Sequence, residues 1–368
     1  MPADNRRTLG ARRFALMGAV LAFACGSAAL ACSTAVLGLP DRPIVAYSFD
    51  FAPTGGGFFY ANPASAARRS IMQDGESEPA EWFVEYASVT FSQMGPGMPV
   101  AGMNTAGLVV TLMWNEQVVF GGRKDAPIVN ELELIQRLLD TSGTVDEALE
   151  SLDGVRIQGL VPIHYLLADR TGNTAAVMPT EAGYRIHSGD DMPLPALTNT
   201  SYADLLAHVS AYDGFGGAQA VPAGGRSDEP SSLERFVLAA NAVRRVGSTA
   251  KQHHAFNLLN QVANGESRWQ IAFDPSLGQI AFRIVGANKV FAVDLSAIDF
   301  QCRELPLSAE LSGASAIDVV ADLAPVDPAQ ISDVSREVLA ALSQGGGIGP
   351  EIADELTAGL LQSAVCLG

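Results

Sequence analysis

The stretch Ala29-Leu30-Ala31-Cys32-Ser33-Thr34 marks a boundary in the chain. The first 13 residues hold four arginines, and residues 14–31 form an uncharged, largely apolar run. Together with the small residues Ala29 and Ala31 at the cleavage positions, this is the pattern of a secretory signal peptide. Cleavage after Ala31 would make Cys32 the first residue of the mature chain. That residue would then carry both a thiol and a free α-amino group, which supply a nucleophile and a base.

Two other interpretations of Cys32 stay open. Leu30-Ala31-Cys32 resembles a weak lipobox, in which Cys32 would carry a lipid and anchor a periplasmic binding protein, although Ala29 stands where a lipobox prefers leucine. The remaining cysteines after the leader are Cys302 and Cys366, and an exported chain with three cysteines can hold one disulfide and one free thiol. In that case Cys302 pairs with Cys366, whereas a disulfide from Cys32 to either is the alternative. We favour the nucleophile.

Composition limits the class of protein. The 368 residues are 48% hydrophobic and 17% charged, with a net charge of −17, which indicates a globular, acidic protein. A surface of this sign repels phosphate backbones and anionic membranes, so nucleic acid is not an expected partner. No second apolar run reaches the roughly 20 residues of a membrane helix. We therefore expect a periplasmic or secreted protein that leaves the membrane once its signal is removed; Arg12-Arg13-Phe14 only partly resembles a twin-arginine signal.

Hydrophobic periodicity predicts strands that alternate in blocks with helices. Residues 51–81, rich in Gly, Pro, Ala and Ser, are predicted to form a long loop, and residues 82–93 and 108–114 a hairpin closed through Gly102–Gly107. The other predicted strands are 34–37, 44–50, 163–168, 174–178, 183–187, 269–273, 279–284 and 290–295.

Capping signals and helical spacing predict the helices. Thr144-Val145-Asp146-Glu147 and Ser231-Ser232-Leu233-Glu234 are predicted capping boxes, and the predicted helices are 130–140, one from 145, 202–210, 233–246, 251–262, 334–342 and one from Pro350. Because no aromatic residue follows Phe300, residues 301–368 are predicted to be a helical extension packed on the same domain. The alternating blocks of predicted strands and helices indicate one layered α+β domain that comprises residues 32–300 and follows a signal peptide of residues 1–31.

Five segments in order resemble the choloylglycine hydrolase family, which includes penicillin V acylases and bile-salt hydrolases. They are Cys32, the strand 44–50, Gly102-Met103-Asn104, Leu197-Thr198-Asn199 and the helix start 231–236, and the resemblance covers Cys32 to about Leu295. It implies a four-layer αββα N-terminal-nucleophile hydrolase sandwich. It also implies that the mature cysteine attacks a linear, non-peptide amide to form a thioester, with neither a metal nor an organic cofactor.

The resemblance implies roles for three residues around the reacting carbonyl. Asp50 would hold the α-amine, the side chain of Asn199 would donate to the oxyanion, and the backbone N–H of Trp114 would complete the oxyanion hole while its indole lines the acyl pocket. Apart from the resemblance, these are an ordinary strand-end aspartate, a turn asparagine and a core tryptophan.

Two further positions concern the charge on the sulfur. Arg235 would be a permanent cation that favours the Cys32 thiolate, although an arginine on a helix more often faces solvent. Tyr47 stands where the family commonly has an arginine, three residues before the aspartate. Because a phenol carries no positive charge, this departure places penicillin and bile-salt specificity in question more than the hydrolase chemistry.

Other kinds of site lack their motifs. The five histidines show no zinc-protease spacing, and the chain has no Cys-x-x-Cys or Gly-x-Ser-x-Gly motif. The expected function is hydrolysis of a small acylated amine, in the manner of a penicillin V acylase or an N-acyl homoserine lactone acylase. The apolar segment 51–60 and Phe215 favour an amphipathic acyl group, and homo-oligomerisation stays open.

Overall fold

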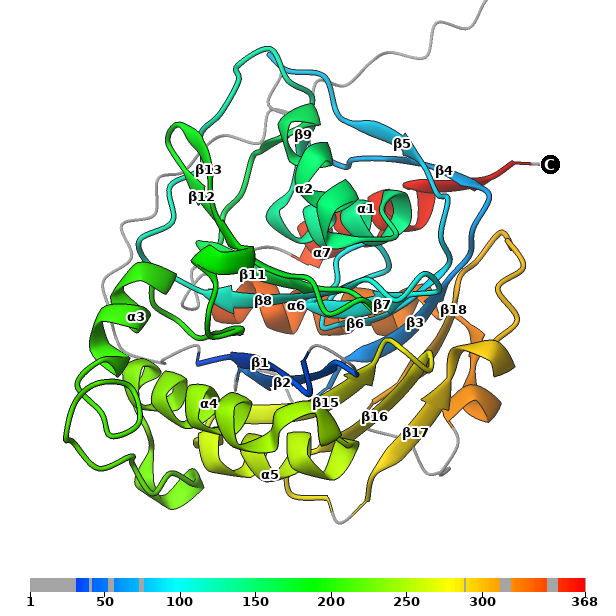
Figure 1. Cartoon of the computed structure of the whole chain (residues 1–368). Coiled ribbons are helices and arrows are strands. Elements are labelled where there is room, and N and C mark those ends of the chain that lie inside the picture. The colour runs from blue at the N-terminus through cyan, green and yellow to red at the C-terminus, as the bar shows by residue number, and fades with distance from the viewer. Residues whose placement is uncertain are drawn as a thin grey trace, which may run out of the picture.

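The computed structural model describes residues 31–39, 42–51, 56–72, 76–287, 289–311, 319–342 and 350–367. The predicted signal peptide, apart from Ala31, lies outside these residues. Two antiparallel sheets are stacked in the middle of the molecule, with helices on both outer faces (Figure 1). This is the four-layer αββα arrangement that the family resemblance implies.

The first sheet has six strands in the order β14-β1-β2-β15-β16-β17. All its neighbours are antiparallel, and the inner strands β2 and β15 are buried along nearly their whole length. The strand bounds are β1 Ser33–Leu37, β2 Ile44–Asp50, β14 Ala196–Leu197, β15 Ser267–Asp274, β16 Gln279–Ile284 and β17 Phe291–Asp294. These bounds confirm the strands predicted from alternation and apolar runs, whereas the two-residue β14 was not predicted as a strand.

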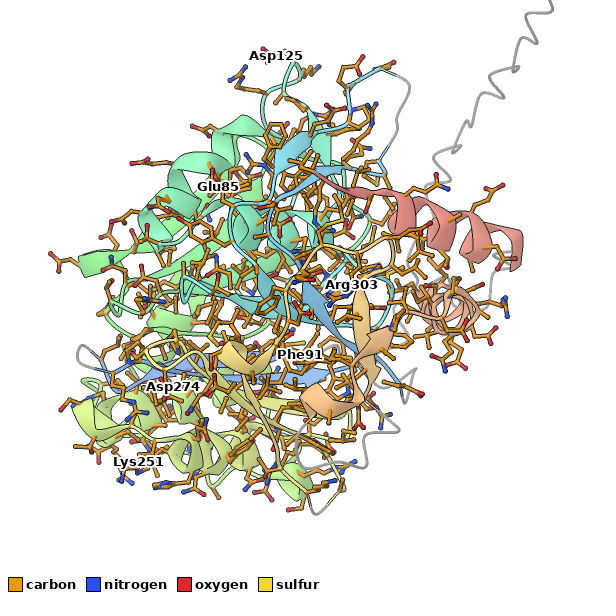
Figure 2. The ribbon with its side chains drawn as sticks, turned by 90° about the vertical axis from the view of Figure 1, so that its right-hand side faces the viewer. Glu85, Phe91, Asp125, Lys251, Asp274 and Arg303 are labelled. Atoms are coloured by element: carbon orange, nitrogen blue, oxygen red, sulfur yellow. A yellow bond between two sulfur atoms is a disulfide. The ribbon has the colours of Figure 1, made fainter. Side chains whose placement is uncertain are left out.

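The second sheet has nine strands in the order β13-β12-β11-β8-β7-β6-β3-β18-β19. Phe91 of this sheet packs edge-on against Phe273 and Phe282 of the six-stranded sheet, with ring centroids 6.1 and 5.2 Å apart, so the core lies between the sheets (Figure 2). The bounds are β3 Phe58–Asn62, β6 Ser88–Ser92, β7 Ala101–Asn104, β8 Val109–Trp114, β11 Ile163–Ala168, β12 Thr174–Thr180, β13 Gly183–Ser188, β18 Leu307–Glu310 and β19 Ala324–Pro325.

Two predictions in this half of the chain were wrong. The predicted loop 51–81 contains β3 and β4 (Ala66–Arg69), because the aromatic run after Gly57 is buried between the layers. The predicted hairpin is also wrong, since β7 lies between β6 and β8 and includes Gly102. This glycine is required by packing, because a Cβ there would lie 2.7 Å from a Leu139 methyl carbon and from the Val89 carbonyl oxygen.

Helices cover both outer faces. α4 (Ser232–Val246) and α5 (Gln252–Val262) pack on the six-stranded sheet, with α3 (Tyr202–Val209) beside α4, while α1 (Glu131–Thr141) packs on β7 and β8 and contacts α2 (Val145–Ser151). The capping box at Ser231 is confirmed. At Thr144 only half of the predicted box forms, because Glu147 accepts from the Gly143 N–H instead of from Thr144.

The residues after Phe300 form strands as well as the predicted helices. α6 (Pro328–Leu342) and α7 (Pro350–Gln362) pack against each other beside the sandwich (Figure 2), β18 pairs with β3, and β20 (Ala364–Cys366) pairs with β4. The Cys302–Cys366 disulfide is present and Cys32 is a free thiol, which is the pairing expected if the exported chain holds one disulfide. The short strands β5 (Glu81–Phe83), β9 (Ile128–Val129) and β10 (Arg156–Ile157) complete the described α-helices and β-strands. Within the described segments, no helix combines the length and apolar character needed to cross a bilayer.

Candidate active site

Cys32 lies just before β1 and is 2% exposed. The N–H of Ala31, the residue before it, donates to the main-chain oxygen of Asp50 at 3.3 Å. Burial, and secondarily the charge of Asp50, raise the pKa of the thiol to about 12, while Tyr47 and Arg235 act in the opposite direction. In this form of the chain the sulfur is therefore protonated at neutral pH.

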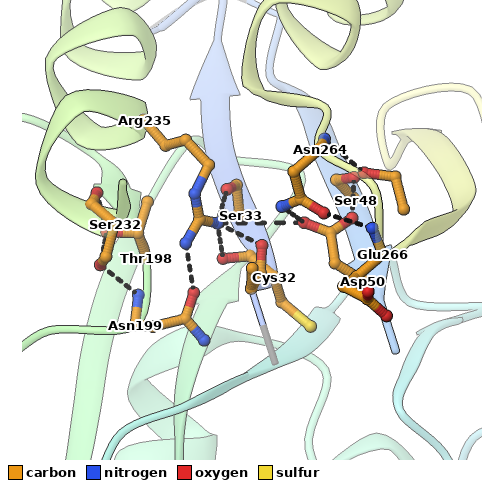
Figure 3. Close-up of polar contacts among 12 residues, drawn as sticks. Cys32, Ser33, Ser48, Asp50, Thr198, Asn199, Ser232, Arg235, Asn264 and Glu266 are labelled. Atoms are coloured by element: carbon orange, nitrogen blue, oxygen red, sulfur yellow. Dashed lines mark hydrogen bonds and ion pairs between the residues drawn. The ribbon is translucent and has the colours of Figure 1, made fainter. Parts of the chain in front are cut away.

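Arg235 joins the start of β1 to Asn199. The capping box at Ser231 fixes the first turn of α4 and directs the Arg235 guanidinium onto the strand, where it is 2% exposed. One terminal nitrogen donates to the Cys32 carbonyl at 2.8 Å, to the Ser33 hydroxyl at 2.7 Å and to the Ala31 carbonyl (Figure 3). The other donates to the Asn199 side-chain oxygen at 2.8 Å. A buried cation is tolerated here because several acceptors surround it.

Asn199 reaches Cys32 through the pairing of β14 with β1. Leu197 lies opposite Thr34 in this antiparallel pair, so the chain two residues further on arrives beside Cys32. The Asn199 N–H donates to the Ser232 hydroxyl at 3.0 Å. Because Arg235 holds Oδ1, the amide nitrogen of Asn199 lies on the side away from the guanidinium (Figure 3).

Asp50 ends β2 and is fully buried. Its carboxylate accepts from the Ser48 hydroxyl at 2.6 Å and from Asn264 Nδ2 at 3.2 Å, and it lies 3.9 Å from Arg235. Burial raises its pKa to about 6, and Arg235 opposes that rise. Asn264 comes from the turn between α5 and β15. The sequence analysis missed it, because an Asn-Gly pair between a helix and a strand signals only a turn.

A break in the pairing of β15 with β2 lies next to Asp50. Ser267 pairs with Asp50 and Trp269 with Phe49, so the register shifts by one residue between them. Such bulges redirect side chains and occur often beside functional sites. Here the bulge adjoins the turn that brings Asn264 to the carboxylate.

Tyr47 lies in the middle of β2 with no exposed surface. It is opposite Thr34 of β1, and its interaction with Cys32 lowers the pKa of the thiol. Its hydroxyl has no hydrogen-bond partner of ordinary geometry among the described residues. The structure thus brings together Cys32, Tyr47, Asp50, Asn199 and Arg235.

Trp114 is placed differently from these five residues. It ends β8 in the other sheet, opposite Ile163, and its indole donates to Glu116 at 2.5 Å. The next residue, Asn115, donates to His164 Nδ1 at 3.2 Å, and His164 Nε2 donates to the Thr198 carbonyl at 2.6 Å. The end of β8 is therefore connected to the segment that carries Asn199 through a residue the sequence analysis missed.

Cys32 lines neither of two surface cavities of the described chain. A cavity of about 410 Å³ is lined by Gln117, Met178, Arg185 and Asp204 among others, and Cys32 does not line it. Among the described residues, no group of three or more His, Cys, Asp or Glu side chains is arranged to hold a metal ion.

The four stacked layers have the arrangement of the N-terminal-nucleophile hydrolase fold. Residues 61–274 match the family model "Acyl-coenzyme A:6-aminopenicillanic acid acyl-transferase". The chain therefore belongs to this family. The family match and the solved structures described next confirm the resemblance to penicillin V acylases and choloylglycine hydrolases.

Solved structures share the fold at low sequence identity. Penicillin V acylase from Agrobacterium tumefaciens has a TM-score of 0.64 and 20% identity, and the match covers 81% of this chain and 98% of that chain. A mutant of conjugated bile acid hydrolase from Clostridium perfringens has a TM-score of 0.58 and 14% identity, with 74% and 94% covered. No curated protein sequence matches the chain significantly.

Proposed function

We propose that this protein hydrolyses a linear C–N amide bond with Cys32 as an N-terminal nucleophile, after export and removal of residues 1–31. The observation that carries the proposal is the position of Arg235, which contacts the Cys32 main chain and the Asn199 side chain and lies 3.9 Å from Asp50. Residues far apart in sequence thus surround the one free thiol of the described chain.

The proposed reaction uses groups at the start of β1. The thiol proton moves to the α-amine, the sulfur attacks the amide carbon, and the carbonyl oxygen becomes an oxyanion. Asn199 and the Trp114 backbone N–H would stabilise that oxyanion, while Asp50 orients the amine. The C–N bond then breaks, the leaving amine takes the proton from the α-ammonium, and water hydrolyses the thioester to release the acid and the thiol.

The substrate class follows from the family and the neighbouring structures. The family description and both neighbours concern acyl groups joined to amines or released from them. We therefore propose a small acylated amine in the periplasm or medium, with penicillin V and N-acyl homoserine lactones tested first. Tyr47 at the position of the family arginine makes bile salts a weaker candidate.

The test combines activity with the chemical state of the N-terminus. Cys32→Ala should abolish amine release from a panel of acylated amines, with an unchanged melting temperature, and the exported wild-type protein should begin at an unmodified Cys32 that alkylating agents label. Asn199→Ala should reduce turnover about 10²-fold. Full activity of Cys32→Ala would disprove the nucleophile, and an N-terminal peptide carrying a diacylglyceryl and a fatty-acyl group would instead identify a lipid-anchored binding protein.

A further inference from the structure

Both terminal nitrogens of Arg235 donate to oxygen atoms, its Nε has no partner among the described residues, and none of its hydrogen bonds there goes to the sulfur. One terminal nitrogen contacts two main-chain carbonyls and the Ser33 hydroxyl, and the other contacts Asn199. A thiolate in a buried site needs hydrogen-bond donors of its own, because burial disfavours the charged form. Another residue must therefore donate hydrogen bonds to the Cys32 thiolate.

The pairing of β1 with β2 places Tyr47 next to the sulfur. Tyr47 is directly opposite Thr34, and Cys32 is two residues before Thr34. Since alternate residues of a strand face the same side of the sheet, Cys32 and Tyr47 are diagonal neighbours on one face. A diagonal separation of roughly 7–8 Å is within reach of an aromatic side chain.

The Tyr47 hydroxyl is buried and has no hydrogen-bond partner of ordinary geometry within the described residues. A buried polar group without a partner costs free energy, so native proteins retain few of them without a reason. A thiol is a poor acceptor, whereas a thiolate is a strong one. A hydroxyl left without a partner by the protonated sulfur would therefore gain one when the sulfur ionises.

We propose that the Tyr47 hydroxyl is the hydrogen-bond donor to the Cys32 thiolate and takes the place of the family's arginine. This inference rests on the proposed function. Tyr47 donates a hydrogen bond and keeps its proton throughout, while the thiol proton goes to the α-amine. When the sulfur bonds to the substrate carbon, it loses its charge and the hydrogen bond weakens.

Electrostatics agree with this assignment. Burial and the nearby Cys32 and Asp50 raise the pKa of Tyr47 well above its usual value, so the phenol stays protonated. The interaction with Tyr47 lowers the pKa of the Cys32 thiol, against the larger effect of burial.

The test compares Tyr47→Phe with Tyr60→Phe in the mature protein. Tyr60 is also fully buried, and its hydroxyl has no partner among the residues that the structure describes. It lies in β3 and packs with Phe58, Val326 and Ile331. Tyr47→Phe should raise the pKa of the Cys32 thiol by about 1–2, measured from alkylation rates against pH, and should reduce kcat/KM at pH 7 about tenfold or more. Neither variant should have a lower melting temperature, and Tyr60→Phe should keep the wild-type thiol pKa and kcat/KM.

A wild-type thiol pKa and kcat/KM in folded Tyr47→Phe would overturn the inference. If that variant does not fold, 3-fluorotyrosine at position 47 provides a second test. It is a stronger donor of nearly the same shape, and it should lower the thiol pKa; an unchanged value would again overturn the inference. The nucleophile is tested separately by Cys32→Ala. If Cys32→Ala is inactive but Tyr47→Phe behaves like wild type, the role of Tyr47 as a donor to the thiolate is wrong, whereas the proposed hydrolase activity still stands.

Discussion

A single buried guanidinium organises the candidate site. Arg235 is at the fourth position of an amphipathic helix, where a charged side chain usually faces solvent, yet it is 2% exposed. The sequence indicated a cation there only through a family resemblance. Its partners include the main-chain carbonyls of Ala31 and Cys32, which have no sequence signature. Asn199 and Asn264, which complete the site, lie in connections outside the helices and strands. For that reason Asn264 could not be predicted. His164 could not be predicted either, because a single histidine in a buried strand does not show which residues it will contact.

Glu131 is a buried carboxyl group that the proposed reaction does not use, and it predicts a pH dependence of stability. It is 2% exposed and accepts from the N–H groups of Leu160 and Val161, and burial raises its pKa from 4.5 to about 7. Because the pKa of Glu131 is higher in the folded chain than in the unfolded chain, the protonated carboxyl favours the folded state below pH 4.5. This stabilisation is lost as the pH rises to 7. Glu131→Gln should remove this dependence, so relative to wild type it should gain up to about 3 kcal/mol between pH 4.5 and pH 8.

Urea unfolding of both proteins at pH 4.5 and pH 8 measures this difference. The comparison between the two proteins at each pH removes the contributions of Asp50 and His164, which are common to both. An equal difference in unfolding free energy at the two pH values would show that Glu131 does not titrate in this range.

At the scale of elements, the N-terminal cap of α4 should affect turnover as well as stability. Ser231→Ala removes a side-chain cap that should be worth about 1 kcal/mol, and it loosens the turn from which Arg235 extends. Thr144→Ala is a matched control, because Thr144 caps α2 on the other sheet by the same type of bond to Glu147. Both variants should melt at similarly lower temperatures, and only Ser231→Ala should lower kcat. If Ser231→Ala and Thr144→Ala have equal kcat values, the cap of α4 does not affect turnover.

The elements that the sequence predicted well are those with one clear physical signal. Buried strands such as β2 and β15 are continuous or alternating apolar runs, and α1 and α4 begin at asparagine or serine caps. The wrong predictions concern segments whose residues fit two different structures. Gly102 suggested a turn, but close packing of α1 on β7 requires it. The glycine-rich composition of residues 51–57 concealed β3, whose aromatic side chains begin immediately afterwards.

At the scale of the whole molecule, the Cys302–Cys366 disulfide holds the end of the chain. It joins residues 64 apart and lies beside β20, which pairs with β4. Replacing both cysteines with serine should cost about 2–5 kcal/mol of unfolding free energy, seen as a lower melting temperature. A reductant should have the same effect on wild type and none on the double variant, since Cys32 forms no disulfide. If the reductant leaves the melting temperature of wild type unchanged, the bond contributes no stability.

The residues that surround Cys32 come mostly from one half of the sandwich. Tyr47, Asp50, Asn199, Arg235 and Asn264 belong to the six-stranded sheet, its helices or their connections. By contrast, α6 and α7 pack with β3 of the nine-stranded sheet, and the disulfide joins β20, which pairs with β4, to the segment before β18. Laboratory evolution can use this separation. Libraries for heat tolerance can be restricted to the outer surface of the nine-stranded side, and those for new substrates can sample the connections around α3 and α4.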